Sequence, residues 1–106
     1  MYWVILVIAG FFETAWVIGM KYSEGFTKLY PGLFAVITMV ISVYLLSVSV
    51  KTLPVGSAYA VWTGIGAVGT AVLGIILFGE SKELIRLFFI FLIIVGIIGL
   101  RIFSSK

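Results

Sequence analysis

Glu13 is the residue best placed to do chemistry, because it interrupts the apolar stretch "MYWVILVIAGFFETAWVIGM". An ionised side chain near the centre of a membrane-length helix costs about 2.5–3.5 kcal/mol on insertion scales, so residues of this kind usually serve ion or proton pathways. The sequence contains no cysteine and no histidine, so proton chemistry must use carboxylates, lysine or tyrosine. We therefore interpret Glu13 as an ion or proton site that faces a bundle interior, and we expect no metal and no cofactor.

Trp16 lies on the same helical face as Glu13, because three residues separate them. An indole N–H can donate a hydrogen bond to a carboxylate, and the indole ring can face a cation. Tryptophans that anchor a helix usually lie at the membrane interface, which suits Trp3 better than Trp16. This spacing predicts that Trp16 orients Glu13, although a packing role for the ring is the simpler alternative.

Two further segments carry polar side chains at helical spacing. One stripe contains Thr38, Ser42 and Ser49, and the other contains Tyr59, Trp62, Thr63, Gly66 and Thr70. Hydroxyls inside helices often bond only to the carbonyl of the preceding turn, and aromatic rings often only pack. The grouping of several on one side of a helix nevertheless favours a polar cavity.

The elements that must position these residues follow from composition. Of the 106 residues, 63% are hydrophobic and 10% are charged, far from the balance of soluble domains. Charges and turn residues divide the chain into four apolar segments, at about 2–21, 30–50, 56–78 and 84–103, each near the roughly 20 residues that cross a bilayer as a helix. The sequence predicts an all-α membrane protein with four transmembrane helices per subunit, in a single domain covering residues 1–106.

Lysine and arginine are distributed almost equally between the two membrane faces, so they favour neither orientation strongly. If the helices alternate, one membrane face receives four basic residues and the other receives three: Lys21, Lys28, Lys82 and Arg86 against Lys51, Arg101 and Lys106. Since this difference sets orientation, we expect insertion in both directions, and an inverted pair related by a two-fold axis in the membrane plane. The alternative is that one of these basic residues dominates and fixes a single orientation. The basic residues form no stripe, so no nucleic-acid partner is expected.

Glycines occur at spacings that permit close helix approach and bending. Gly10 shares the face of Glu13, while Gly64, Gly66 and Gly69 form "GIGAVG", which imitates a dinucleotide motif but follows no strand. A second group, Gly96 and Gly99, predicts a packing face on the last helix, toward another helix or another subunit.

An acidic site without a basic partner inside the membrane suits a cationic substrate. A carboxylate holds a cation when it is deprotonated and carries H⁺ when it is protonated, so the two ligands exclude each other. Mutually exclusive occupancy of Glu13 is the chemical basis of antiport.

The sequence resembles the small multidrug resistance family of four-helix membrane transporters over nearly its whole length. The resemblance rests on "FFETAWVIGMKYSEGF", "LPVGSAYAVWTGIGAVG", "GES…R" and "GIIGL". It implies an antiparallel homodimer of dual-topology subunits in the inner (plasma) membrane, in which Glu13 binds substrate and proton in turn. Some relatives work instead as pairs of two different chains.

Within this family, the chain resembles the guanidinium exporters, which the tryptophan at position 16 and "AYAVWTGIGA" indicate. The resemblance implies proton-coupled export of guanidinium and small guanidinylated cations. It also implies a hydrogen-bond network that orders the Glu13 carboxylate, formed by Trp16, Ser42, Tyr59 and Trp62.

The guanidinium exporters usually have aliphatic residues where this chain has Thr14 and Ala15, so Thr14 is a candidate selectivity position, with Thr38 and Thr63 as two others. Two alternatives to guanidinium export remain open. One is export of hydrophobic quaternary ammonium cations, and the other is a membrane scaffold or regulatory subunit that transports nothing. None of these functions is enzymatic.

Overall fold

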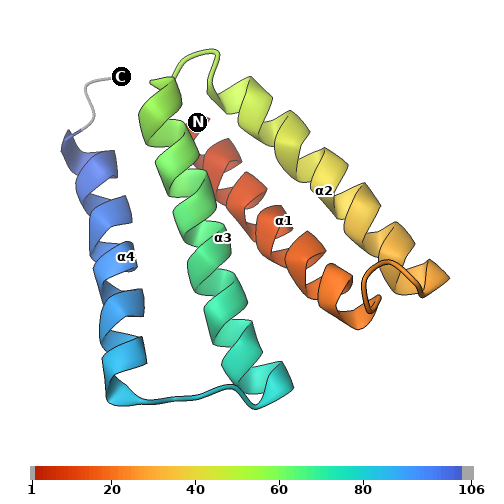
Figure 1. The fold of residues 1–106 in the computed structure, drawn as a ribbon. Coiled ribbons are helices and arrows are strands. Elements are labelled where there is room, and N and C mark those ends of the chain that lie inside the picture. The colour runs from red at the N-terminus through yellow and green to blue at the C-terminus, as the bar shows by residue number, and fades with distance from the viewer. Residues whose placement is uncertain (1, 104–106) are drawn as a thin grey trace.

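A computed structural model describes residues 2–103, which form four α-helices joined by short connections (Figure 1). They are α1 (Tyr2–Tyr22), α2 (Leu29–Ser49), α3 (Val55–Phe78) and α4 (Leu84–Phe103). All four are long and apolar enough to cross a membrane, with 20 to 24 residues each. The predicted all-α class with four membrane-spanning helices is confirmed. The bounds of α2 and the start of α3 lie one residue earlier than the sequence indicated.

Successive helices run antiparallel, and α1 is the central element. It packs along both α2 and α3, whereas α4 packs along α3 on the far side (Figure 1). The described chain is flat, with extents of 43 × 34 × 17 Å. The start of α1 and the end of α4 lie at one end of the molecule, where Arg101 lies over the Trp3 ring at 5.1 Å from its centroid.

The buried core is small and sits between α1, α3 and the α2–α3 connection. Its main cluster comprises Leu6, Leu53, Ala58 and Val61. Among the described residues, α4 contributes no buried side chain. Because lipid tails solvate apolar side chains as well as protein does, helices in a membrane can leave such surfaces uncovered. The whole outer surface of α4 is therefore available to lipid or to a second subunit.

The α1–α2 connection is a tight turn with three successive left-handed residues, Glu24, Gly25 and Phe26, at φ of 51°, 77° and 70°. Buried Ser23 supports it: its hydroxyl donates to the Met20 carbonyl at 2.7 Å and accepts the Phe26 N–H at 2.8 Å. These bonds offset the steric cost that non-glycine residues incur in this region.

Candidate functional site

Glu13 lies near the middle of α1, and Trp16 is one turn further along the same face. The Trp16 indole N–H donates a hydrogen bond to Oε1 of Glu13 at 2.7 Å. Both side chains are partly buried. This donor–acceptor distance is at the short end of the range for N–H···O hydrogen bonds, so Trp16 holds one carboxyl oxygen in a fixed position.

Two glycines of α3 make room for the neighbouring residues of α1. A Cβ atom added to Gly66 would overlap Cγ of Glu13, and one added to Gly69 would overlap the hydroxyl of Thr14. The Thr14 hydroxyl also lies 3.4 Å from the Gly66 carbonyl, its acceptor across the helix contact. The backbone of α3 therefore passes directly beside the carboxylate, and Thr14 belongs to the α1–α3 contact.

The other four glycines that the sequence analysis named divide into two kinds. Gly10 and Gly64 each face an isoleucine side chain across a helix contact, 2.6 and 3.0 Å from the position of an added Cβ. The isoleucines are Ile65 and Ile97 respectively. Added Cβ atoms at Gly96 and Gly99 would meet nothing within 4 Å in the described chain. The packing of another subunit against Gly96 and Gly99 therefore stays a prediction.

Glu13 opens onto a cavity of about 420 Å³ between α1, α3 and the start of α4. Its polar lining consists of Glu13, Thr63, Thr70, Glu80 and Arg86. Small and apolar residues complete the walls, namely Val17, Gly66, Ala67 and Ala71. The cavity has room for a small organic cation beside the carboxylate.

Ser42 forms the second polar centre, buried where α1, α2 and α3 meet. Its hydroxyl donates to the Ala9 carbonyl at 2.8 Å and accepts the Trp62 indole N–H at 2.9 Å. The ring of Tyr59 packs on Trp62 with 5.7 Å between centroids, and Tyr59 is 58% exposed. One hydroxyl therefore ties three helices together.

The site residues implied by the resemblance form two hydrogen-bonded pairs. Within residues 2–103, no hydrogen bond joins the Glu13–Trp16 pair to the Ser42–Trp62 pair. Thr38 and Thr63 bond carbonyls of their own helices, at Phe34 and Tyr59, with distances of 2.7 and 2.9 Å. Of these two threonines, Thr63 also lines the Glu13 cavity.

Sequence reasoning did not place Glu80 and Arg86 in the lining of the Glu13 cavity. Arg86 Nη2 donates to Glu80 Oε1 at 2.7 Å, and Arg86 Nη1 donates to the Ser81 carbonyl at 2.9 Å. The "GES…R" pattern was the available signal. Glu80 and Arg86 are six residues apart across a loop, however, so helical spacing could not predict that they touch. Among the described residues, no group of three acidic side chains could hold a metal.

Comparison with known proteins identifies the family. The sequence model described as Small Multidrug Resistance protein matches residues 1–93. The chain belongs to the small multidrug resistance family. It is 57% identical over 104 residues to the "Guanidinium exporter" of Yersinia pseudotuberculosis, covering 98% of this chain and 100% of that protein.

Two other small multidrug resistance relatives carry the same name. The "Guanidinium exporter" of Proteus vulgaris is 51% identical over 104 residues, with 98% of this chain and 100% of that protein covered. The protein of that name from Citrobacter freundii is 53% identical over 102 residues, covering 96% and 97% of the two chains. The predicted family and subtype are thus confirmed. The chain is a multi-pass membrane protein, of the inner membrane in bacteria.

Proposed function

We propose that this small multidrug resistance protein exports guanidinium and small guanidinylated cations in exchange for protons, with cation and proton binding Glu13 in turn. The observation that carries the proposal is the Glu13 carboxylate inside a membrane-spanning helix, fixed by the 2.7 Å bond from Trp16 and open to a cavity. The names of the relatives at 51–57% identity support the choice of cation.

The chemistry of the pair suits a planar cation. Guanidinium presents parallel N–H donors that match the two oxygens of a carboxylate, and it is less strongly hydrated than an ammonium ion. Trp16 occupies one direction at Oε1, and the remaining lone pairs of both oxygens stay available toward the cavity. Protonation of Glu13 removes the charge and one acceptor, so a protonated site releases the cation.

We also propose that the working unit is an antiparallel homodimer of subunits inserted in both directions. The four-against-three balance of basic residues and the uncovered surface of α4 support it. A pair of two different chains is the alternative. Purified protein that transports without any second gene product would favour the homodimer.

Exchange in liposomes tests the function directly. Purified protein is reconstituted with a trapped pH indicator, and a guanidinium gradient is expected to drive protons in the opposite direction. Glu13→Gln keeps the size of the side chain but cannot ionise, so it should abolish the exchange. Glu83→Gln is the matched control, because Glu83 is an exposed residue of the α3–α4 connection, outside the cavity lining, and should exchange like the unmodified protein.

The same assay separates the rival functions. Proton movement driven only by aromatic or quaternary ammonium cations would replace guanidinium as the substrate. Exchange that survives Glu13→Gln would remove Glu13 from its proposed role. No proton movement with any cation would leave a scaffold or regulatory subunit as the function.

A further inference from the structure

A second carboxylate, Glu80, resembles Glu13 in how α3 holds it. Glu13 Cγ fills the space that a Cβ on Gly66 would need, and Glu80 Oε1 fills the corresponding space at Gly74. Eight residues separate the two glycines, which places the carboxylates about 12 Å apart along the helix axis. One glutamate therefore lies at the middle of the membrane span and the other at its end.

A continuous groove joins the two carboxylates. Glu80 and Thr70 line the cavity of about 420 Å³ that contains Glu13, and both also line a neighbouring cavity of about 590 Å³ between α1 and α3. Lys21 and Glu24 lie in the wall of this second cavity. A cation that moves toward Glu13 from this end passes Glu80 and then the Thr70 hydroxyl.

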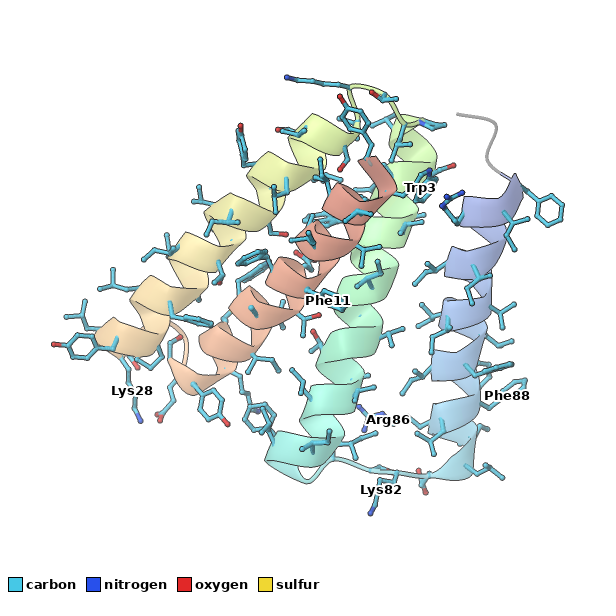
Figure 2. The ribbon with its side chains drawn as sticks, turned by 180° about the vertical axis from the view of Figure 1, so that it is seen from behind. Trp3, Phe11, Lys28, Lys82, Arg86 and Phe88 are labelled. Carbon is cyan, nitrogen blue, oxygen red and sulfur yellow. The ribbon has the colours of Figure 1, made fainter. Side chains whose placement is uncertain are left out.

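The group now bound at Glu80 is itself a guanidinium. Arg86 reaches from the start of α4 toward α3 (Figure 2), where its planar group donates to the Glu80 carboxylate at 2.7 Å and to the Ser81 carbonyl at 2.9 Å. Free guanidinium carries the same planar array of N–H donors. The chain thus contains a built example of the contacts that such a ligand would make at Glu80.

We propose that Glu80 is a second guanidinium-binding site at the mouth of the groove, and that Arg86 is its resident competitor. Guanidinium displaces the Arg86 side chain from Glu80, occupies that carboxylate and then moves along α3 to Glu13. This inference rests on the proposed export of guanidinium.

Exposure makes the exchange at Glu80 practicable. The side chains of Arg86 and Glu80 are 31% and 44% exposed. Ion pairs with this much contact with water contribute little to stability and exchange readily. A displaced arginine remains solvated at the membrane surface, because its long side chain reaches water from the first turn of α4.

Competition and a purely structural ion pair predict different changes in the KM for guanidinium when Glu80 or Arg86 is replaced, and transport kinetics can distinguish them. If the pair only held the loop, removing either partner would change the KM for guanidinium in the same direction. Under competition, Glu80→Gln raises this KM about three- to tenfold, because one charge-assisted carboxylate contact is lost. Arg86→Gln and Arg86→Lys lower this KM by about twofold or more. Glutamine lacks the positive charge of arginine, and the lysine ammonium lacks its planar fork, so both compete less well for Glu80.

Two controls remove the general effect of surface charge. Lys82→Gln and Glu83→Gln make the same charge changes in the α3–α4 connection, close to Glu80 and Arg86 in sequence, at exposed residues outside the groove lining. Arg86→Lys preserves the charge, so a lower KM in that variant shows that the planar guanidinium group of Arg86, and not its charge alone, competes with the substrate. If Glu80→Gln matches Glu83→Gln and Arg86→Gln matches Lys82→Gln, the inference is overturned.

Equilibrium binding provides a measurement that does not depend on transport. Guanidinium chloride is titrated calorimetrically into purified Glu13→Gln protein, whose single-size elution profile establishes that it is folded. Residual binding that Arg86→Gln strengthens and Glu80→Gln abolishes supports the second site. Absence of residual binding in both the Glu13→Gln protein and its Arg86→Gln derivative overturns it.

The outcomes for the two proposals are distinct. Guanidinium-driven proton movement by the unmodified protein, with no change of KM in any Glu80 or Arg86 variant beyond the controls, overturns this inference alone. Absence of that movement in the unmodified protein overturns the proposed function, and the second site with it.

Discussion

Replacing Gly66 by alanine should displace the Glu13 carboxylate without destabilising the helices. The added Cβ would overlap Cγ of Glu13, and it would lie 3.1 Å from Cβ of Glu13. The backbone of α1 cannot retreat easily, because Thr14 anchors it in the adjacent α1–α3 contact. We therefore expect Glu13 to rotate to another rotamer and to lose the hydrogen bond from Trp16.

The size of the effect follows from the bond that is lost. A hydrogen bond to a charged group contributes about 1.5–3 kcal/mol, and this is the free energy that Glu13 should lose when it no longer accepts the bond from Trp16. At about 1.4 kcal/mol for each factor of ten, kcat/KM for guanidinium should fall about 10- to 150-fold. Alanine is a better helix former than glycine, so helix propensity itself should not destabilise α3.

Liposome exchange kinetics and helix content measured by circular dichroism test this prediction together. Gly56→Ala is the matched control, since Gly56 lies in the same helix and an added Cβ meets nothing within 4 Å. A Gly66→Ala protein that remains helical and loses exchange, beside an active Gly56→Ala protein, supports the geometry. Equal kcat/KM in the two variants would refute the close approach of α3 to Glu13.

Three further perturbations follow from other contacts. Ser42→Ala should lower the free energy of unfolding in detergent by about 1–2 kcal/mol relative to Ser47→Ala, because Ser42 bonds to two neighbouring helices whereas Ser47 bonds to a carbonyl of its own helix. The Lys28 hydrogen bond and charge lower the pKa of Glu24, so their stabilisation is complete above the ordinary carboxyl pKa and is lost as pH falls through the lowered one. Lys28→Gln should return the NMR titration of Glu24 to the ordinary range; an unchanged midpoint would contradict this. Gly99→Leu should keep the helices intact but reduce cross-linked dimers, if that face meets a second subunit.

The parts of the fold that sequence could predict are those governed by a single helix. Hydropathy locates the four spans to within about one residue, because crossing lipid requires a continuous apolar helix. The adjacency of Glu13 and Trp16 also follows from helical spacing alone, and the hydrogen bond between them lies within one turn.

Contacts between helices were less accessible to sequence reasoning. The faces of Ser42 and Trp62 follow from periodicity, but their pairing depends on how α2 and α3 meet around α1. Helical periodicity gives the direction of a side chain and leaves its partner undetermined. The same holds for Thr14. Its residue type suggested a selectivity position, but helical periodicity could not predict that its side chain packs against Gly69 of α3.

The ion pair of Glu80 and Arg86 lay further beyond prediction, because its partners come from opposite sides of a turn. Gly79 ends α3 in a left-handed conformation, and α4 begins at Leu84, so no single periodicity spans the pair. Only the three-dimensional course of the loop brings Arg86 to Glu80, whose carboxylate lies against Gly74.

The chain by itself leaves the Glu13 carboxylate incompletely satisfied, which connects the cost of burying it to its use. Among residues 2–103, Glu13 accepts one hydrogen bond, from Trp16, whereas an ionised carboxylate can accept about four. A carboxylate inside a membrane is expensive unless its remaining lone pairs find donors. Under the function proposed above, a proton or a guanidinium ion would meet that need, and each would exclude the other from Glu13. The proposed function thus connects the energetic cost of burying the Glu13 carboxylate with the binding of a cation there.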